Sequence, residues 1–337
     1  MKEEKSQFSK WKVVLPMLIG LGVICYMITK EFFGENSEAN LKSLESVSIT
    51  VHTVFWLFVA LLLMVGRDLG FMIRYRYLTE KTLSWTQSLK VTLLAEFGSA
   101  ITPSTVGGSS MAILFLAKEG VSVGRSTTIV FVTLLLDELF FVVSVPFFLL
   151  LIPFDRLFMG SSAVETGVIG LFMIAYVIKL IICSVLILGL FFKPQAIRWL
   201  ILQIFRIPFL QRWRGAAYKA GDDILVSSNE VKGKGLRYWL PLILATVLSW
   251  SSRYLVVNAI FMAFFQVHEN LLMVVSPTPG GSGFSEFIFE GYLSEFIPIM
   301  GLVPVIIIIW RLLSYYNYLF IGSILVPRWA RQAFGKK

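Results

Sequence analysis

Long apolar stretches alternate with short polar ones along most of this chain. Six of them have about the 20 residues that a membrane-spanning helix needs, or more; they cover residues 11–29, 49–72, 126–152, 167–192, 238–266 and 299–327. The first follows a basic segment but lacks a small-x-small cleavage site, so we expect an uncleaved helix rather than a signal peptide. The pattern predicts an all-α polytopic membrane protein with six full transmembrane helices.

Two further segments combine short apolar pieces with helix-breaking residues. Residues 77–125 contain Pro103, Gly107, Gly108 and Ser109, and residues 267–298 contain Pro277, Pro279, Gly280, Gly281 and Gly283. Proline removes a backbone donor and glycine loosens the chain, so each segment should break as a helix there. Non-helical backbone at membrane depth must lie in protein or in a water-filled cavity. The alternative is that both segments are surface loops.

The charges between the apolar stretches predict the orientation. Acidic residues dominate 30–48, whereas basic residues dominate the stretch after residue 72, the long loop 193–237 and the C-terminal tail. By the positive-inside rule, both termini and the basic loop 193–237 are cytoplasmic, and the loop should lie along the headgroup surface. Segment 77–125 would then enter and leave on the cytoplasmic side and 267–298 on the other.

This orientation predicts one transmembrane domain, 1–337, with two opposed re-entrant segments in an inverted repeat. The pseudo-repeat halves are 1–152 and 167–327, an arrangement common among secondary transporters. Thirty residues separate Gly108 from Glu138, and thirty separate Gly281 from Arg311. One mismatch opposes the symmetry, because Arg253 precedes Gly281 more closely than Arg67 precedes Gly108. The leg before Pro277 is therefore short.

Composition narrows the class of protein. Hydrophobic residues make up 56% of the chain, charged residues 15%, and the mean hydropathy is +0.77, which is unlike a soluble domain. The net charge of +9 comes from basic residues at the ends of apolar runs, so we expect no nucleic-acid partner. The cysteines and histidines stand alone along the sequence, and we expect no metal site, no cofactor and no catalytic residue.

Charged residues inside the apolar stretches are the candidate substrate-binding groups. A charge at the centre of a spanning helix costs about 2.5–3.5 kcal/mol on insertion scales, so these side chains should face the interior and find partners. Arginine also matches a phosphate with two parallel hydrogen bonds. Structural ion pairing is the alternative, above all for Lys179. The candidates are Arg67, Asp137, Glu138, Arg253 and Arg311.

One more candidate follows the second break. Glu286 and Glu290 are four residues apart, so they share one face of the helix expected after Gly283. Glu286 could contact the substrate or cap that helix. The first break has only Ser109 and Ser110 at the corresponding place, so we expect the two breaks to differ in chemistry.

From about residue 45 onward the chain resembles a known family. The sequences TPSTVGGSSMA, TPGGSGFSE and WRLLSYY are similar to those of the lysylphosphatidylglycerol synthetase transmembrane region, which also occurs alone as flippase-like membrane proteins. The resemblance implies a lipid-translocating unit for a lipid with a charged or phosphate-bearing headgroup. It carries over to Pro279, Gly280, Gly281, Gly283, Glu286 and Arg311. The family's soluble aminoacyl-transferring domain is absent, so lipid aminoacylation is not implied.

The expected function is that of a lipid flippase or transporter, not an enzyme, that moves a phospholipid or polyprenyl-phosphate lipid between leaflets by alternating access. A membrane-embedded transferase for polyprenyl-linked substrates and a small-ion or solute transporter are the alternatives. The sequence allows two protein partners, a separate lipid-modifying enzyme and a second copy of the chain. The expected location is the bacterial cytoplasmic membrane.

Overall fold

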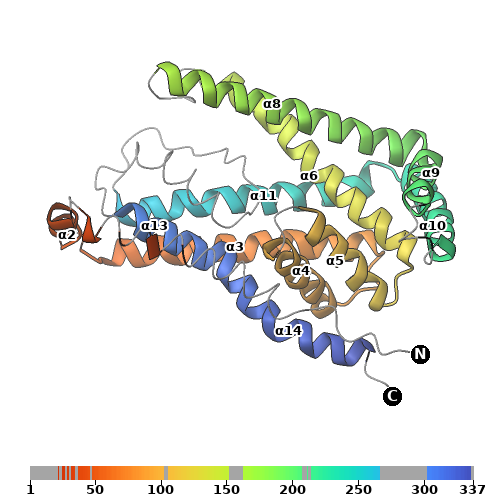
Figure 1. The fold of residues 1–337 in the computed structure, drawn as a ribbon, viewed down its shortest axis with the longest axis horizontal. Helices are drawn as coiled ribbons and strands as arrows, with labels where there is room; N and C mark the ends of the chain where they lie inside the picture. The colour runs from red at the N-terminus through yellow and green to blue at the C-terminus, as the bar shows by residue number, and fades with distance from the viewer. Residues whose placement is uncertain are drawn as a thin grey trace. The chain divides into compact units, whose positions relative to one another are not determined.

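The computed structural model describes residues 48–101, 105–151, 162–206, 214–265 and 302–334, with Gln211 and short pieces between residues 22 and 45. All regular structure in these ranges is helical (Figure 1). The helices are α2 (Ser37–Glu45), α3 (Val51–Leu78), α4 (Trp85–Ala100), α5 (Thr105–Lys118), α6 (Val123–Leu151), α8 (Ser162–Ile187), α9 (Pro194–Ile204), α10 (Arg214–Lys232), α11 (Leu236–Phe264), α13 (Leu302–Arg311) and α14 (Asn317–Phe334). Two π-helical segments, η1 (Leu188–Phe192) and η3 (Leu312–Tyr316), extend α8 and join α13 to α14.

Five helical segments of the described chain are long and apolar enough to cross a membrane: Val51–Leu78, Val123–Leu151, Phe172–Phe192, Leu236–Phe264 and Val305–Val326. They coincide with five of the six predicted spans, and the chain is a multi-pass membrane protein. The first predicted span, 11–29, lies outside the described residues except for short pieces, and the second break, 267–298, lies wholly outside them. So the total of six spans and the inverted repeat stay predictions.

The prediction of the second span, 49–72, ends too early. Helix α3 continues to Leu78, so Arg74 and Arg76 are helical residues and not part of a loop. The physical reason is local: arginine is a good helix former, and no proline or glycine follows Gly70 before the helix ends. The chain then turns through Glu80 and Lys81, whose φ angles are 53° and 63°.

Helix α4 begins with a reciprocal cap. The backbone amide of Gln87 donates to the Ser84 hydroxyl at 3.2 Å, and the backbone amide of Ser84 donates to Gln87 Oε1 at 2.8 Å. This Ser-x-x-Gln arrangement satisfies two backbone donors that the first turn leaves open. The turn after α3 therefore leads directly into α4.

Helices α4 and α5 form a hairpin whose arms are each too short to cross alone. At 16 and 14 residues they measure about 24 and 21 Å, against about 30 Å for the hydrocarbon core. At one end a Cβ on Gly98 would lie 2.6 Å from Met111 Cγ, and at the other Gln87 donates to Glu119 at 2.7 Å. The arms thus run side by side in opposite directions, as a re-entrant segment requires.

The helix break falls between Ala100 and Thr105, with Pro103 outside the described residues. Gly107, Gly108 and Ser109 lie within the first turns of α5, although the sequence suggested that they belong to the break itself. Gly108 permits close approach, because a Cβ there would collide with the Ser99 side chain on α4. This glycine therefore brings the two arms together instead of interrupting them.

The described residues form two compact units. The first comprises those of Met1–Asp68, Leu89–Ala112 and Ser251–Lys337, and the second those of Leu69–Ser88 and Ile113–Trp250. The core of the first unit joins α3, α11 and α13 to the start of α14 and contains Ala60, Met64, Val256, Ile260, Phe261, Leu302, Ile306, Ile307 and Tyr318. These residues come from the apolar faces of separate helices. Their burial against one another stabilises the unit.

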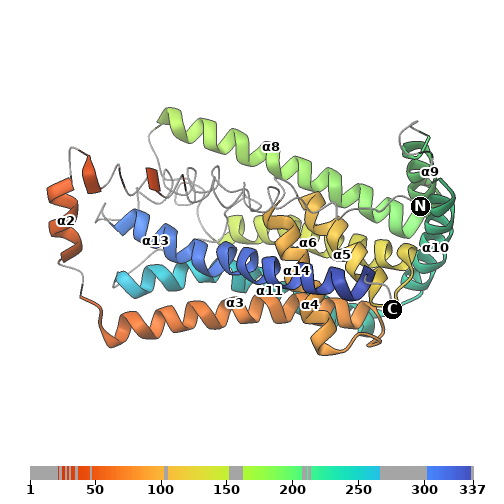
Figure 2. The same ribbon diagram turned by 60° about the horizontal axis from the view of Figure 1, so that its bottom comes forward.

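In the second unit, α6 packs against α8 and α10, and α9 packs against α10 (Figures 1 and 2). Most of the predicted basic loop 193–237 is helical and forms α9 and α10. Arg198 on α9 pairs with Asp222 on α10 at 2.8 Å. Gly221 allows this approach, because a Cβ there would lie 2.8 Å from Arg198 Cγ.

Gly70 lies at a tight contact between α3 and α11, and this contact can be tested by substitution. A Cβ at Gly70 would lie 2.5 Å from the Ala245 carbonyl oxygen and 2.7 Å from Ser249 Cβ, so α3 and α11 touch backbone to backbone. We expect Gly70→Ala to destabilise the protein by about 1–3 kcal/mol through overpacking. Thermal unfolding of the purified protein in detergent measures the change.

The matched control is Gly170→Ala. Gly170 is also helical, in α8, but has nothing within 4 Å of its Cβ position. Alanine is the better helix former, so this change should leave the melting temperature equal or slightly higher. Equal melting temperatures for the two variants would contradict the tight contact at Gly70.

Candidate functional site

A buried ion cluster in the first unit centres on Arg67. Its side chain is 1% exposed and forms an ion pair with Glu96, which α4 supplies five residues before the break. Asp68, the next residue on α3, lies 3.5 Å from the guanidinium. A guanidinium in so dry a place must be matched by carboxylates, because the interior does not replace the water it has lost.

Tyr318 joins this cluster from α14. Arg67 Nη1 donates to the Tyr318 hydroxyl at 2.7 Å, and that hydroxyl donates to Asp68 Oδ1 at 2.7 Å. The guanidinium carbon also lies 4.9 Å from the centre of the tyrosine ring. The hydroxyl thus accepts from the cation and donates to the anion, which ties α14 to α3 through one side chain.

Arg253 on α11 belongs to the same cluster. It interacts electrostatically with Arg67, Glu96 and Tyr318, and it also acts on Asp68. With both arginines and both carboxylates ionised, the cluster carries no net charge. An anion that entered it would have to displace a carboxylate or arrive with a cation or a proton.

Arg311 lies at the π-helical segment η3, in the same unit. Its side chain is 2% exposed, and its guanidinium lies 4.5 Å from the Trp310 ring and 5.2 Å from the Tyr315 ring. The Tyr315 hydroxyl donates to the carbonyl of Ala100, the last residue of α4, at 2.9 Å. The aromatic side chain next to Arg311 therefore reaches the helix end at the first break.

The π-helical geometry itself marks this segment. Short π-helical insertions are rare and occur often at functional sites, because the wider turn redirects the side chains that follow. Here η3 separates Arg311 from Tyr318, which pairs with Arg67. The segment 311–318 thus connects the break at Ala100 with the buried ion cluster.

The second unit holds its own ion pairs between helices. Arg74 on α3 is fully buried and forms an ion pair with Asp137 on α6, and Trp250 Nε1 on α11 donates to the same carboxylate at 2.7 Å. Glu138 pairs with Lys179 on α8 at 3.0 Å. Lys179 also lies 4.2 Å from the ring of Phe141. Each acidic residue of α6 thus has a cation from another helix.

The predicted site residues therefore fall into separate groups. Arg67 and Arg253 lie in one cluster and Arg311 at the break, all in the first unit, while Asp137 and Glu138 pair with Arg74 and Lys179 in the second. Lys179 has an ion-pair partner in Glu138, as the alternative of structural ion pairing predicts for this lysine. Seven predicted site residues lie outside the described residues: Pro103 of the first break, Pro277, Pro279, Gly280, Gly281 and Gly283 of the second, and Glu286.

Sequence reasoning missed four members of these clusters. Asp68 and Glu96 are carboxylates in apolar surroundings, and that signal was present in the sequence. Arg74 was missed because the second span was ended at residue 72. Tyr318 had no signal, since a tyrosine in a spanning helix is common, and its role depends on a contact between residues 250 apart.

The Tyr318 hydroxyl provides a test of the cluster. Tyr318→Phe keeps the ring in the core but removes hydrogen bonds to a buried cation and a buried carboxylate. We expect a loss of about 1.5–3 kcal/mol in the free energy of unfolding, the range for hydrogen bonds to charged groups. Tyr218→Phe is the control, because that hydroxyl is on an exposed residue with a 3.4 Å contact to Arg214. Equal stability of the two variants in detergent would refute the pairing.

Comparison with known proteins agrees with this architecture. The sequence profile of the lysylphosphatidylglycerol synthase TM region matches residues 13–322. A UPF0104 membrane protein of Archaeoglobus fulgidus is 27% identical over 292 residues, which cover 80% of this chain and 85% of the relative. No solved structure matches the chain. Because this profile covers residues 13–322, which is most of the chain, the chain belongs to the lysylphosphatidylglycerol synthase TM region family.

Proposed function

We propose that this protein is a lipid flippase or transporter, not an enzyme, that moves a lipid with a phosphate-bearing headgroup between the two leaflets. The observation that carries the proposal is the charge-balanced cluster of Glu96, Asp68 and Arg253 around the buried Arg67, in the unit that also holds the first break and Arg311. Such an arrangement offers cations to an anion and has carboxylates that can release them. The phospholipid or polyprenyl-phosphate lipids expected from the sequence have the required headgroup.

The proposed mechanism is an exchange of ion-pair partners. In the empty protein, Glu96 and Asp68 neutralise Arg67. An incoming phosphate would take over one guanidinium through two parallel hydrogen bonds, the geometry in which arginine binds phosphate best. Because a carboxylate must then leave or take up a proton, binding would be coupled to a rearrangement of α3 and α4. Such coupling is what alternating access needs.

The hairpin α4–α5 would supply the moving or lining element. Both arms of the hairpin are short. The first arm, α4, ends at Ala100, whose carbonyl accepts a hydrogen bond from the Tyr315 hydroxyl. We propose that the hairpin is re-entrant, that its counterpart at 267–298 opposes it, and that Arg311 and Glu286 contact the headgroup between the two breaks. Both termini would be cytoplasmic, in a bacterial cytoplasmic membrane. A separate enzyme would supply any lipid modification.

Reconstitution into liposomes with fluorescently labelled anionic phospholipid tests this proposal. Arg311→Ala removes a buried guanidinium beside the break, and we expect the translocation rate to fall about 10–100-fold, which corresponds to the loss of about 1.5–3 kcal/mol from a charged hydrogen bond. Arg311→Lys keeps the charge but not the fork, and should fall in between. Accessibility of the label to a membrane-impermeant quencher measures the rate.

Arg198→Ala is the matched control. Arg198 also carries a guanidinium in an ion pair, but its side chain is 34% exposed on α9, where such pairs contribute little. Its liposomes should translocate lipid like the unaltered protein. Unaltered translocation by Arg311→Ala would refute the phosphate role. Ion currents without lipid movement would favour the ion-transporter alternative instead.

A further inference from the structure

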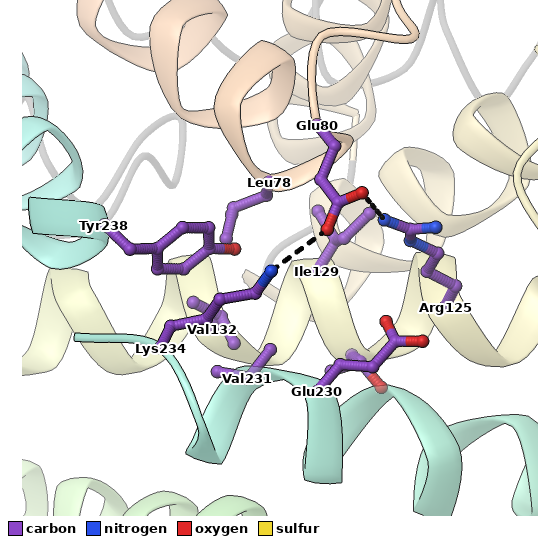
Figure 3. A pocket seen from close by; sticks show the side chains of 10 residues that line it. Leu78, Glu80, Arg125, Ile129, Val132, Glu230, Val231, Lys234 and Tyr238 are labelled. Atoms are coloured by element: carbon purple, nitrogen blue, oxygen red, sulfur yellow. Dashed lines mark hydrogen bonds and ion pairs between the residues drawn. The ribbon is translucent and has the colours of Figure 1, made fainter.

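A second charged site lies in the second unit, apart from the ion pairs described above. Figure 3 shows the Glu80 carboxylate between Lys234 and Arg125, with Glu230 nearby. Glu80 follows the end of α3, Arg125 is in the first turn of α6, and Lys234 lies between α10 and α11. Three separate parts of the unit thus meet at one carboxylate.

Both contacts between the Glu80 carboxylate and its cations are long. Lys234 Nζ lies 3.3 Å from Glu80 Oε1, and Arg125 Nη2 lies 3.6 Å from Glu80 Oε2. Well-formed charged hydrogen bonds between nitrogen and oxygen are about 2.7–2.9 Å long. Neither contact of Glu80 is a close charged hydrogen bond, so an anion from solution can compete with this carboxylate for its cations.

The backbone that presents Glu80 is strained. Glu80 and the following Lys81 both have positive φ, at 53° and 63°, although neither is glycine. Such conformations cost free energy and occur often at ligand sites, where the surrounding structure holds them in place. The Lys81 amide, which donates to the Arg76 carbonyl at 2.8 Å, fixes this turn.

The surrounding groups would accept an anion. A cavity of about 220 Å³ is lined by Tyr77, Glu80, Lys81, Lys234 and Tyr238. Each lysine ammonium lies over a tyrosine ring, at 5.9 Å for Lys81 and 5.4 Å for Lys234. The hydrogen bond from Lys234 and the charge of Arg125 lower the pKa of Glu80, so it is an anion at neutral pH. Arg125, Lys234 and Glu80 are all partly exposed, so a ligand can reach them from solvent.

We propose that Lys234 and Lys81 form a binding site for a phosphate-bearing anion in this cavity, and that Glu80, which also pairs with Arg125, occupies the site as an internal anion when no ligand is bound. Binding would displace Glu80 from Lys234. The phosphate could belong to a lipid headgroup or be free in solution, since both present the same tetrahedral oxyanion. The site is independent of lipid translocation at the buried arginines.

Direct binding to the purified full-length protein in detergent tests the site. The probes are short-chain phosphatidylglycerol, inorganic phosphate, and diacylglycerol as a phosphate-free control, with affinity read by isothermal titration. Glu80→Gln removes the competing charge, and we expect it to tighten phosphate binding about fivefold or more. Lys234→Ala should weaken it about tenfold, whereas Lys232→Ala, an exposed lysine outside the cavity, should leave it unchanged.

The outcomes separate a binding site from a structural clasp. If Glu80 only holds three segments together, Glu80→Gln lowers the melting temperature without tightening binding, and the proposal is wrong. Equal affinities of the Lys234→Ala and Lys232→Ala variants would overturn it as well. Should Glu80→Gln fail to fold, Lys81→Asn, a residue that tolerates positive φ, carries the test and should weaken phosphate binding. Phosphatidylglycerol binding without inorganic phosphate binding identifies a lipid headgroup; binding of both identifies the phosphate alone.

Discussion

The ion pair between Arg67 and Glu96 is the contact on which the first unit depends. A guanidinium that is almost completely buried has lost the water that stabilised it, and only carboxylates and hydroxyls held at close range can compensate. Meeting that need brings α3, α4, α11 and α14 together around one charge. Apolar packing holds these helices near one another, but it does not select one register. The paired charges do, because a shift of one residue would leave a cation alone in the interior.

Backbone polarity imposes a second constraint at the first break. Helix α4 ends at Ala100, which is buried, and the last carbonyl groups of a buried helix end need partners other than water. The Tyr315 hydroxyl satisfies one of them. Glycines at 98 and 108 allow α5 to return along α4 at close range. The hairpin is therefore stabilised by small residues along its length and by a side chain from the π-helical segment at its end.

Two kinds of arginine site result, and their surroundings give them different chemistry. Arg67, Arg74 and Arg311 are almost fully buried, where electrostatic interactions are strong and an unpaired charge is very unfavourable. Arg125 is about one-third exposed, and its contact with Glu80 is long. Exchange of partners at a dry site requires the helices to move, whereas exchange at a wet site requires only a side chain to swing away.

The sequence by itself determined the features that depend on local composition. Five apolar stretches of the described chain are membrane-length helices, because crossing a hydrocarbon layer demands a run of apolar residues of that length. The helix end near Pro103 followed in the same way from residues that cannot continue a helix. The first span, the second break with Glu286, and the inverted repeat stay predictions.

Only the tertiary structure decided which charges belong together. Arg67 finds Glu96 and Tyr318, Asp137 finds Arg74, and Glu138 finds Lys179, each from a different helix. No periodicity along the chain encodes such pairs, since the long helices α3, α6, α8 and α11 are apolar on several faces. The burial of a charge could be predicted from its surroundings in sequence, but its partner depends on how the helices pack.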